Sequence, residues 1–300
     1  MLSYQRITNE SSFNCTSSNL TIDSKNNMFQ GPIYIQESTY MVDGIGGTTW
    51  DGSILICEML VFLKSILNSC NIIELGAGTG VCGILASALG AKESILSDRE
   101  IDLIERNISF NSEHHLLKGS NLYSFPLDWG LPEANNLKCM HVNNKKIDLL
   151  IGAEITCLIK QQSLLVDTIN VLADEDTMII LSFDECSSPI SKVRYEELFN
   201  IKMEEKGFHH RNLIDANVKW YKDVETNQQI DESCMNKSYV YKATFDIANS
   251  YSKFSKDLFN NLDDISRSEG PITSQLHHLV IRFNYYIVLH KLKNYNSRSL

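Results

Sequence analysis

A glycine-rich stretch in the first third of the chain has the residue types that best fit cofactor chemistry. Residues 74–80 read E-L-G-A-G-T-G and overlap the end of a short apolar run at 71–75. Alternate glycines let the backbone turn tightly and approach a ligand, because no Cβ atom stands in the way. A helix expected directly after them would offer free N–H groups in its first turn. We therefore expect a cofactor at this loop.

Two cofactor classes are compatible with the loop taken alone. Residues 78–83 read G-T-G-V-C-G, which fits the dinucleotide pattern G-x-G-x-x-G. Asp98 follows Gly78 by about 20 residues, the distance at which a ribose-binding carboxylate is expected. The pattern by itself leaves open a nicotinamide enzyme and an S-adenosylmethionine-dependent methyltransferase.

Carboxylates around the loop favour the cationic cofactor. Glu74 precedes the first glycine, where its charge would repel a pyrophosphate and attract the ammonium and sulfonium groups of S-adenosylmethionine. Asp128 and Glu154 follow two further expected strands. Their place is the carboxyl edge of the sheet, where open α/β folds bind ligands. We therefore favour a methyltransferase over a dehydrogenase.

The elements that must position these residues alternate between short strands and helices. Strands are expected at 71–75, 94–97, 122–127, 147–153 and 178–183, and helices at about 53–68, 81–89, 101–111, 160–173 and 191–206. Two further strand-like segments, 217–224 and 237–246, predict a terminal antiparallel hairpin. The alternation predicts an α/β fold with a parallel sheet and helices on both faces.

The chain divides into three expected parts. Residues 1–30 are rich in Ser, Asn and Thr and are expected to form a loose N-terminal leader. Residues 31–246 form the cofactor-binding domain, which opens with a strand at 32–37 and a turn at Gly44–Gly47. Thr48, Thr49 and Asp51 are expected to cap the first helix. Residues 247–300 break the rhythm and are expected to form a helical C-terminal extension.

Composition excludes several classes of protein. The 300 residues carry a formal net charge of −10, which argues against tracking nucleic-acid phosphates and favours a basic or neutral partner, such as a lysine-bearing protein. No apolar run approaches the roughly 18 residues that cross a bilayer. The eight cysteines form no C-x-x-C and show no zinc-ligand spacing, so no metal site is expected. We expect a monomer in the cytoplasm, or also in the nucleus, with reduced, buried cysteines.

Several motifs, taken in order, resemble one known family. They are G-G-T-T-W-D (46–51), E-L-G-A-G-T-G-V-C-G (74–83), S-D (97–98), L-D-W-G (127–130) and D-L-L-I-G-A-E (148–154). The chain resembles the seven-β-strand protein-lysine methyltransferases of the methyltransferase 16 group, the METTL21-like enzymes, over about residues 32–246. This resemblance implies a Rossmann-like seven-stranded methyltransferase sheet, S-adenosylmethionine as cofactor and a protein substrate such as a chaperone or a translation factor.

The resemblance also implies roles for individual residues. Gly76, Ala77 and Gly78, with Gly80 closing the loop, would line the methionine and ribose part of the cofactor. Asp98 would accept hydrogen bonds from the ribose hydroxyls, and Trp129 would lie beside the adenine. Trp50 and Ala153 would close the pocket. Glu154 is the candidate catalytic residue, as the group that orients the substrate amine.

One position departs from the family pattern. The family follows its fourth strand with Asp-x-x-Tyr or Glu-x-x-Tyr, whereas this chain reads Glu154-Ile155-Thr156-Cys157. The acid is present, and a cysteine, which we expect to be a packing residue, replaces the aromatic. This leaves open a methyltransferase for a small molecule or another side chain, and a catalytically silent domain that binds cofactor or a partner.

Overall fold

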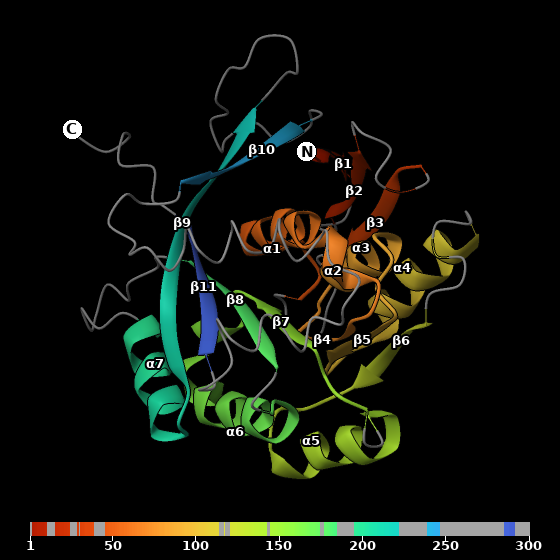
Figure 1. The fold of residues 1–300 in the computed structure, drawn as a ribbon. Helices are drawn as coiled ribbons and strands as arrows, with labels where there is room; N and C mark the ends of the chain where they lie inside the picture. Colours follow the sequence, from red (N-terminus) through yellow and green to blue (C-terminus); the bar gives the residue numbers. More distant parts are fainter. Residues whose placement is uncertain are drawn as a thin grey trace, which may run out of the picture.

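A single mixed sheet organises the molecule, with strand order β3-β2-β1-β10-β9-β11-β8-β7-β4-β5-β6 (Figure 1). The computed structural model describes residues 2–10, 16–24, 29, 31–38, 46–113, 117, 121–142, 145–174, 177–184, 195–221, 239–246 and 285–291. Statements about the structure below concern these residues.

The cofactor-binding half of the sheet is parallel. Its strands are β4 (Asn71–Leu75), β5 (Glu93–Asp98), β6 (Asn121–Pro126), β7 (Leu149–Ala153) and β8 (Met178–Asp184). Each pairs in parallel with its neighbours, in the order β8-β7-β4-β5-β6. All five carboxyl ends therefore meet at one edge of the sheet.

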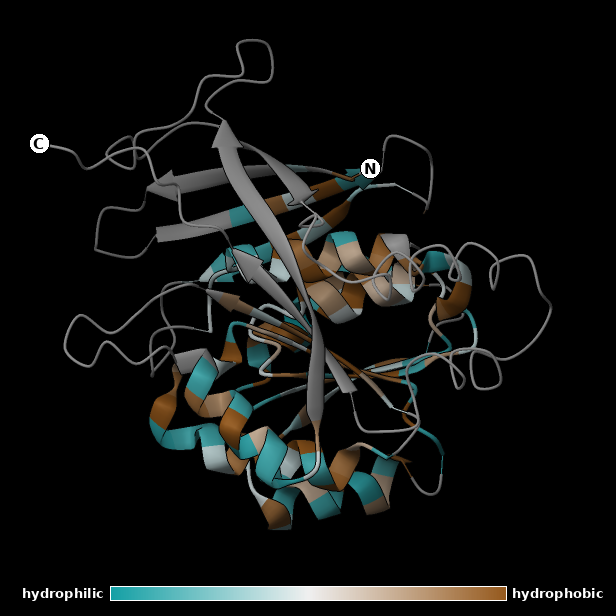
Figure 2. Cartoon of the chain, turned by 60° about the vertical axis from the view of Figure 1, so that its left-hand side comes forward, coloured by the Kyte–Doolittle hydropathy of each residue, from teal (hydrophilic) through white to brown (hydrophobic). Residues whose placement is uncertain are grey.

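Helices cover both faces of this half (Figure 1). One face carries α1 (Asp51–Phe62), α2 (Lys64–Leu67), α3 (Val81–Ala88) and α4 (Asp102–Glu113), and the other carries α5 (Leu131–Leu137), α6 (Gln162–Leu172) and α7 (Tyr195–Glu205). β4 and β7 are buried almost throughout, as expected for central parallel strands made of continuous apolar runs. Figure 2 shows this layering, with hydrophobic central strands and more hydrophilic outward helix faces.

The predicted α/β fold is confirmed. The five strands and the helices between them lie within a few residues of their expected positions. The predicted terminal hairpin is confirmed as well, because β9 (His209–Tyr221) and β10 (Tyr239–Asp246) pair antiparallel from Val240 with Tyr221 to Asp246 with Asp215. The expected strand at 32–37 is β3 (Ile33–Ser38).

The N-terminal segment differs from the expected loose leader. β1 (Leu2–Glu10) and β2 (Thr16–Ser24) form an antiparallel hairpin that joins β3 to β10. Leu2 and Tyr4, and likewise Leu20 and Ile22, are buried at alternate positions. This spacing of two is the signal of a half-buried strand, and the abundant Ser, Asn and Thr residues obscure it.

The C-terminal segment also differs in part from expectation. Residues 285–291, inside the apolar stretch expected to be helical, form strand β11 (Tyr285–Lys291). β11 lies between β8 and β9 and runs parallel to both. An apolar run of this length does not distinguish a buried strand from a helix by periodicity alone. The remainder of 247–300 lies outside the described residues.

Two local details of the helices were not predicted. The helix expected at 53–68 breaks at Leu63 into α1 and α2. The segment after Trp129, for which no helix or strand is predicted, forms α5 and a π-helical turn, Lys138–Val142. Gly130 precedes α5 and Pro132 stands in its first turn, where a missing N–H costs nothing.

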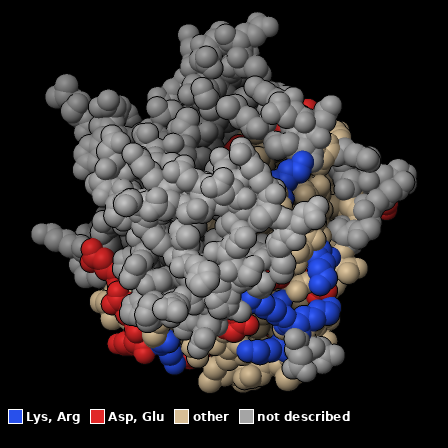
Figure 3. Space-filling view, in the orientation of Figure 1, with Lys and Arg blue, Asp and Glu red and all other residues tan. Residues whose placement is uncertain are grey.

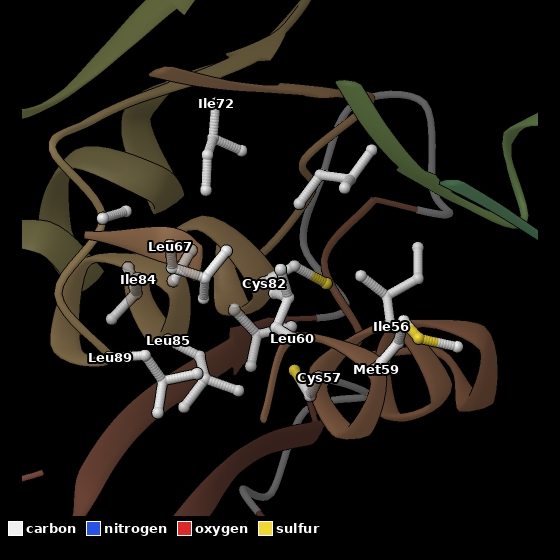
Figure 4. Packing of buried hydrophobic residues seen from close by; sticks show 14 of the residues in the cluster. Ile56, Cys57, Met59, Leu60, Leu67, Ile72, Cys82, Ile84, Leu85 and Leu89 are labelled. Atoms are coloured by element: carbon white, nitrogen blue, oxygen red, sulfur yellow. The ribbon is translucent and has the colours of Figure 1, made fainter. Parts of the chain in front are cut away.

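Helices α1 and α3 pack directly against each other (Figure 4). Cys57 and Leu60 of α1 and Cys82 and Leu85 of α3 are fully buried in this cluster. Cys57, Cys70 and Cys82 therefore behave as the expected buried free thiols. The expectation is wrong for Cys139 and Cys157, which are exposed. Cys15, Cys186 and Cys234 lie outside the described residues.

Helix α3 approaches β4 and β5 closely enough to require glycine. A Cβ atom on Gly83 would overlap Leu96 and lie 2.9 Å from the carboxylate of Glu74. Oε2 of Glu74 accepts a hydrogen bond from the Gly83 N–H at 2.8 Å. Because Gly80, which precedes the helix, has no side chain to cap it, Glu74 satisfies an N–H group of the first turn from the sheet.

Burial raises the pKa of Glu74 to about 8, although the hydrogen bond from Gly83 opposes this shift. The carboxylate is only 3% exposed. Burial penalises the charged form, so the folded state favours protonated Glu74 at neutral pH.

No helix within the described residues is long and apolar enough to cross a membrane. The same residues contain no group of three or more His, Cys, Asp and Glu side chains that could hold a metal ion.

The N-terminal hairpin should contribute to stability as a packed element. We expect Leu20→Ala to lower the free energy of unfolding by about 2–4 kcal/mol, because Leu20 is fully buried. Asn19→Ala, at the exposed neighbouring position, is the matched control and should change it by less than about 0.5 kcal/mol. Urea denaturation of both variants measures the difference, and equal midpoints would show that the hairpin does not contribute.

Glu74 should make stability depend on pH. Its folded pKa lies above the ordinary value of 4.5, so its contribution is complete below about pH 4.5 and is lost as pH rises through about 8. Glu74→Gln removes this loss. We expect the stability of the variant relative to the wild type to rise by about 1 kcal/mol per pH unit between about pH 5 and 8. Thermal unfolding across this range tests it, and a difference that stays constant with pH would contradict it.

Candidate functional site

The predicted site residues meet at the carboxyl edge of the parallel strands. The turn at Gly76–Gly80 follows β4, Asp98 ends β5, and Trp129 comes after β6. Ala153 ends β7, and Glu154 follows it directly. Because neighbouring parallel strands end at the same edge, residues far apart in sequence are brought together here.

The glycine-rich turn has a backbone that only glycine adopts readily at three of its positions. Gly76, Gly78 and Gly80 have φ angles of +61°, +54° and +77°. Between them, Ala77 donates its N–H to the carbonyl of Ser97 at 3.0 Å, and its own carbonyl accepts from the Gly80 N–H at 2.7 Å. The turn is thereby tied both to itself and to the end of β5.

Asp98 holds the centre of this turn. Its Oδ2 accepts a hydrogen bond from the Gly78 N–H at 2.8 Å, and its Oδ1 accepts a longer one from Glu100 N–H at 3.4 Å. Burial raises the pKa of Asp98, and the hydrogen bond from Gly78 opposes the rise. The side chain is half-buried. Its carboxylate therefore anchors the turn and keeps acceptor capacity, through Oδ1, for ligand hydroxyl groups.

Trp129 and Ile155 lie over the first glycine of the turn. A Cβ atom on Gly76 would lie 3.4 Å from the Trp129 ring and would overlap the Ile155 side chain. The Trp129 ring is half-buried, whereas Ala77, which follows Gly76 in the turn, is buried. A glycine at position 76 is therefore required by packing as well as by its φ angle.

Glu74 does not have the position that the sequence suggested. Its carboxylate is buried beneath α3 and is bonded to Gly83, so it supports the helix behind the turn. The charge argument that places Glu74 against a cationic ligand is therefore not supported by its contacts. Asp128 is exposed at the end of β6.

Glu154 links the end of β7 to the start of α1. It is the one non-glycine residue with a positive φ, 53°, among those described. Its Oε1 accepts a hydrogen bond from the Gly52 N–H at 2.7 Å, and its own N–H donates to the carbonyl of Ser182 at 3.0 Å. The N-cap residue of α1 is Trp50, and not one of the predicted caps Thr48, Thr49 and Asp51. Glu154 satisfies that helix end from another strand.

Trp50 lies two residues before Gly52 and is 46% exposed. The residues before it run along the glycine-rich turn: the Gly46 carbonyl lies 2.7 Å from where a Cβ on Gly78 would be, and Thr49 Oγ1 lies 3.1 Å from Thr79 Oγ1. Trp50 precedes α1, and Ala153 and Glu154 lie at the end of β7, the neighbour of β4; that these residues close the pocket stays a prediction. Gly44 and Ile45 lie outside the described residues.

Several buried polar residues shape the site through contacts that the sequence did not indicate. Thr49, Thr79, Asn107 and Ser182 are buried polar residues that bond the turn or its neighbours. The carbonyl of Gly46 lies so close to Gly78 that a side chain at position 78 would overlap it. A glycine pair and scattered Thr or Asn residues are common in loops, so only the three-dimensional contacts distinguish them.

The residues present fit a nucleoside-containing cationic cofactor. Three glycines keep the turn free of side chains, and Asp98 offers an acceptor to a pair of vicinal hydroxyls. The half-buried Trp129 ring is suited to pack against a flat base. Among the described residues, the glycines and Ala77 of the turn have Gly46, Leu96, Ser97, Asp98, Ile104, Trp129 and Ile155 as neighbours outside it, and none of these is a Lys or Arg that would suit the phosphates of a dinucleotide.

A family model and several individual proteins that resemble this chain all describe lysine methyltransferases. The model of the lysine methyltransferase family matches residues 29–206. Protein N-lysine methyltransferase METTL21A of Danio rerio is 32% identical over 155 residues, 51% of this chain and 63% of that protein. METTL21A of Mus musculus is 28% identical over 63% of this chain and 81% of that protein. EEF1A lysine methyltransferase 3 of Xenopus tropicalis is 29% identical over 46% of this chain and 58% of that protein.

The matched region contains α1, the glycine-rich turn, Asp98, Trp129 and Glu154, so the elements that build the site are the ones that the family model covers. The resemblance inferred from the sequence motifs is therefore confirmed. With more than half of its 300 residues matched by the family model, this chain belongs to the lysine methyltransferase family.

Proposed function

We propose that this protein transfers a methyl group from S-adenosylmethionine to the side-chain amine of a lysine in a protein substrate. The observation that carries the proposal is the turn between β4 and α3, which Asp98 pins at Gly78 and Trp129 covers at Gly76. Membership of the lysine methyltransferase family supports the same reaction.

Each residue of the turn has a separate role in holding the cofactor. Gly76, Ala77, Gly78 and Gly80 leave room for its methionine and ribose parts, and the backbone N–H groups of α3 lie behind them. Asp98 accepts hydrogen bonds from the ribose hydroxyls. Trp129 forms one wall for the adenine, and Trp50 and Ala153 close the site. Glu74 acts indirectly, through α3.

The chemistry requires positioning more than acid or base strength. When bound, S-adenosylmethionine supplies a methyl carbon that its sulfonium already activates toward displacement. The protein must therefore exclude water and align the lysine amine. At pH 7, removing the proton of an ordinary lysine with a pKa near 10.4 costs about 4–5 kcal/mol. A desolvated entry at the sheet edge lowers this cost.

Glu154 orients the amine in this proposal. It stands at the end of β7, directly before Ile155, which lies over Gly76. Its left-handed backbone turns the carboxylate toward the N-terminus of α1, where Gly52 binds one oxygen. A fixed negative charge raises the pKa of a nearby ammonium, so Glu154 acts as an orienting group and not as a strong base.

The substrate class follows from the relatives and the charge of the chain. One relative is named for a lysine of EEF1A, and the net charge of −10 favours a basic or neutral protein partner. On the face seen in Figure 3, Lys and Arg side chains of the described residues lie mainly on the right, and acidic side chains lie to the lower left and also among the basic ones. We place the protein in the cytoplasm or nucleus, acting as a monomer on a folded chaperone or translation factor, which is consistent with free Cys57, Cys70 and Cys82.

The exposed Cys157 leaves two competing functions open. It stands where the family has an aromatic residue, and its exposure means that it does not fill the core. A methyltransferase for a small molecule or another side chain would show transfer without a labelled lysine. A silent binding protein would bind the cofactor and transfer nothing. Transfer of tritiated methyl groups to a cell lysate, followed by methyl-site mapping by mass spectrometry, separates these three outcomes.

Asp98→Ala should weaken cofactor binding. The substitution removes both the anchor of Gly78 and the acceptor for the ribose hydroxyls. Hydrogen bonds to a charged group contribute about 1.5–3 kcal/mol, so we expect the dissociation constant for S-adenosylmethionine to rise about 10–100-fold. Isothermal titration calorimetry measures it. Glu113→Ala removes an exposed carboxylate from the end of α4 and is the control. Unchanged affinity in Asp98→Ala would contradict the assignment.

Glu154→Gln separates charge from helix support. The amide oxygen still accepts the Gly52 N–H, so the fold should be retained, whereas the charge that orients the lysine amine is lost. We expect the rate of methyl transfer to fall at least about tenfold at saturating cofactor. Glu154→Ala should in addition lower stability by about 1–3 kcal/mol, because the N–H of Gly52 loses its partner. A wild-type rate in Glu154→Gln would leave Glu154 with a structural role only.

A further inference from the structure

Thr79, in the glycine-rich turn, is held from outside by two separate polar links. It is 2% exposed, so its carbonyl and hydroxyl depend on protein partners. The carbonyl accepts a hydrogen bond from Asn107 Nδ2 of α4 at 2.9 Å. The hydroxyl lies 3.1 Å from the hydroxyl of Thr49. Both links lead back to strand β3.

Asn107 uses its whole amide group for this connection. Its Oδ1 accepts the Gln36 N–H at 2.9 Å, and its Nδ2 donates to the Gln36 carbonyl at 3.0 Å as well as to Thr79. The side chain is 1% exposed. Asn107 therefore fixes the spacing between the outer strand β3 and the cofactor turn.

Asn111, one helical turn further along α4, forms the same pair of bonds to another residue of β3. It bonds the N–H and carbonyl of Tyr34 at 3.0 and 2.7 Å, and its third bond goes to the carbonyl of Asn107 in its own helix. Four helical residues rise about 6 Å and two strand residues about 6.6 Å, so the pair matches alternate residues of β3. Asn111 supports β3 and makes no bond to the turn.

The second link starts at Glu37 of β3. Its Oε1 accepts the N–H of Thr49 at 2.8 Å, and Thr49 then meets Thr79 through the paired hydroxyls. Glu37 and Thr49 are both buried. Two neighbouring residues of β3, Gln36 and Glu37, are thereby connected to the carbonyl and the hydroxyl of one turn residue.

We propose that Asn107 is a positioning residue for the cofactor, which sets the conformation of the glycine-rich turn through the carbonyl of Thr79. The proposal rests on the proposed cofactor site. Asp98 fixes the turn at the N–H of Gly78, and Asn107 fixes it at the carbonyl of the next residue, Thr79. The peptide that joins Thr79 to Gly80 is planar, so holding its carbonyl also directs the N–H of Gly80 at the start of α3.

The pair of asparagines provides a matched experiment. Asn107→Ala and Asn111→Ala each remove both bonds to one residue of β3, and only Asn107→Ala also removes the bond to Thr79. We expect both variants to lower the unfolding midpoint in urea. We expect Asn107→Ala to raise the dissociation constant for S-adenosylmethionine about fivefold or more, and Asn111→Ala to leave it within about twofold of the wild type.

Kinetics add a readout that a merely structural role would not produce. In Asn107→Ala, the KM for S-adenosylmethionine should rise while kcat at saturating cofactor stays near the wild-type value. Asn107→Asp keeps an acceptor for the Gln36 N–H and removes the Nδ2 donor to the Thr79 carbonyl, so it should also raise the dissociation constant about fivefold and serves if Asn107→Ala does not fold.

Equal cofactor affinities in the two asparagine variants would overturn the proposal, because β3 support alone would then explain Asn107. Wild-type affinity in Asn107→Asp would do the same where Asn107→Ala cannot be purified. A wild-type protein that does not bind S-adenosylmethionine would overturn the proposed function itself, and this inference with it. The two failures are therefore distinguishable in one titration series.

Discussion

The hydrogen bond from the N–H of Gly78 to the carboxylate of Asp98 is the constraint around which the site is built. A turn of glycines has no side chains with which to anchor itself, and three of its residues occupy backbone conformations that an unconstrained chain would leave readily. The bond fastens the turn to the neighbouring strand, which the parallel register has already brought to the same edge. Trp129, Ile155 and the segment before α1 can then pack against a fixed surface.

Carboxylates around the turn stabilise helices more than they face a ligand. Glu74 bonds an N–H in the first turn of α3, and Glu154 bonds one in the first turn of α1. The first N–H groups of a helix have no partner within it, so a carboxyl oxygen from an adjacent strand satisfies one of them, a role that Glu74 fills in the protonated form that burial favours. The acids that suggested a cationic cofactor therefore lie around the site. Two of them, Glu74 and Glu154, support the helices that border it.

The sequence predicts whatever depends on local pattern. The alternation of apolar strands and helices and the turn at Gly76–Gly80 follow from spacing, whereas the role of Trp129 follows from the family resemblance; the structure places Asp98, Trp129 and Glu154 at the same edge of the sheet. Contacts between distant segments were not predictable. Nothing near Gly52 in the sequence indicates that Glu154 caps its helix, and nothing in α4 indicates that Asn107 reaches Gln36 and Thr79. The N-terminal hairpin was missed because abundant Ser, Asn and Thr residues obscure the alternation that Leu2 and Tyr4, and Leu20 and Ile22, show.

The asparagine pair of α4 has a consequence for how molecules of this protein meet one another. β3 is the end strand of a sheet of eleven, and its outward N–H and carbonyl groups would otherwise invite a strand of a second molecule to add on. Asn107 and Asn111 occupy those groups at Gln36 and Tyr34 with side-chain amides that imitate a neighbouring strand. At these two residues the edge of the sheet has no free backbone groups to offer to a strand of another molecule, so α4 protects this edge from edge-to-edge pairing.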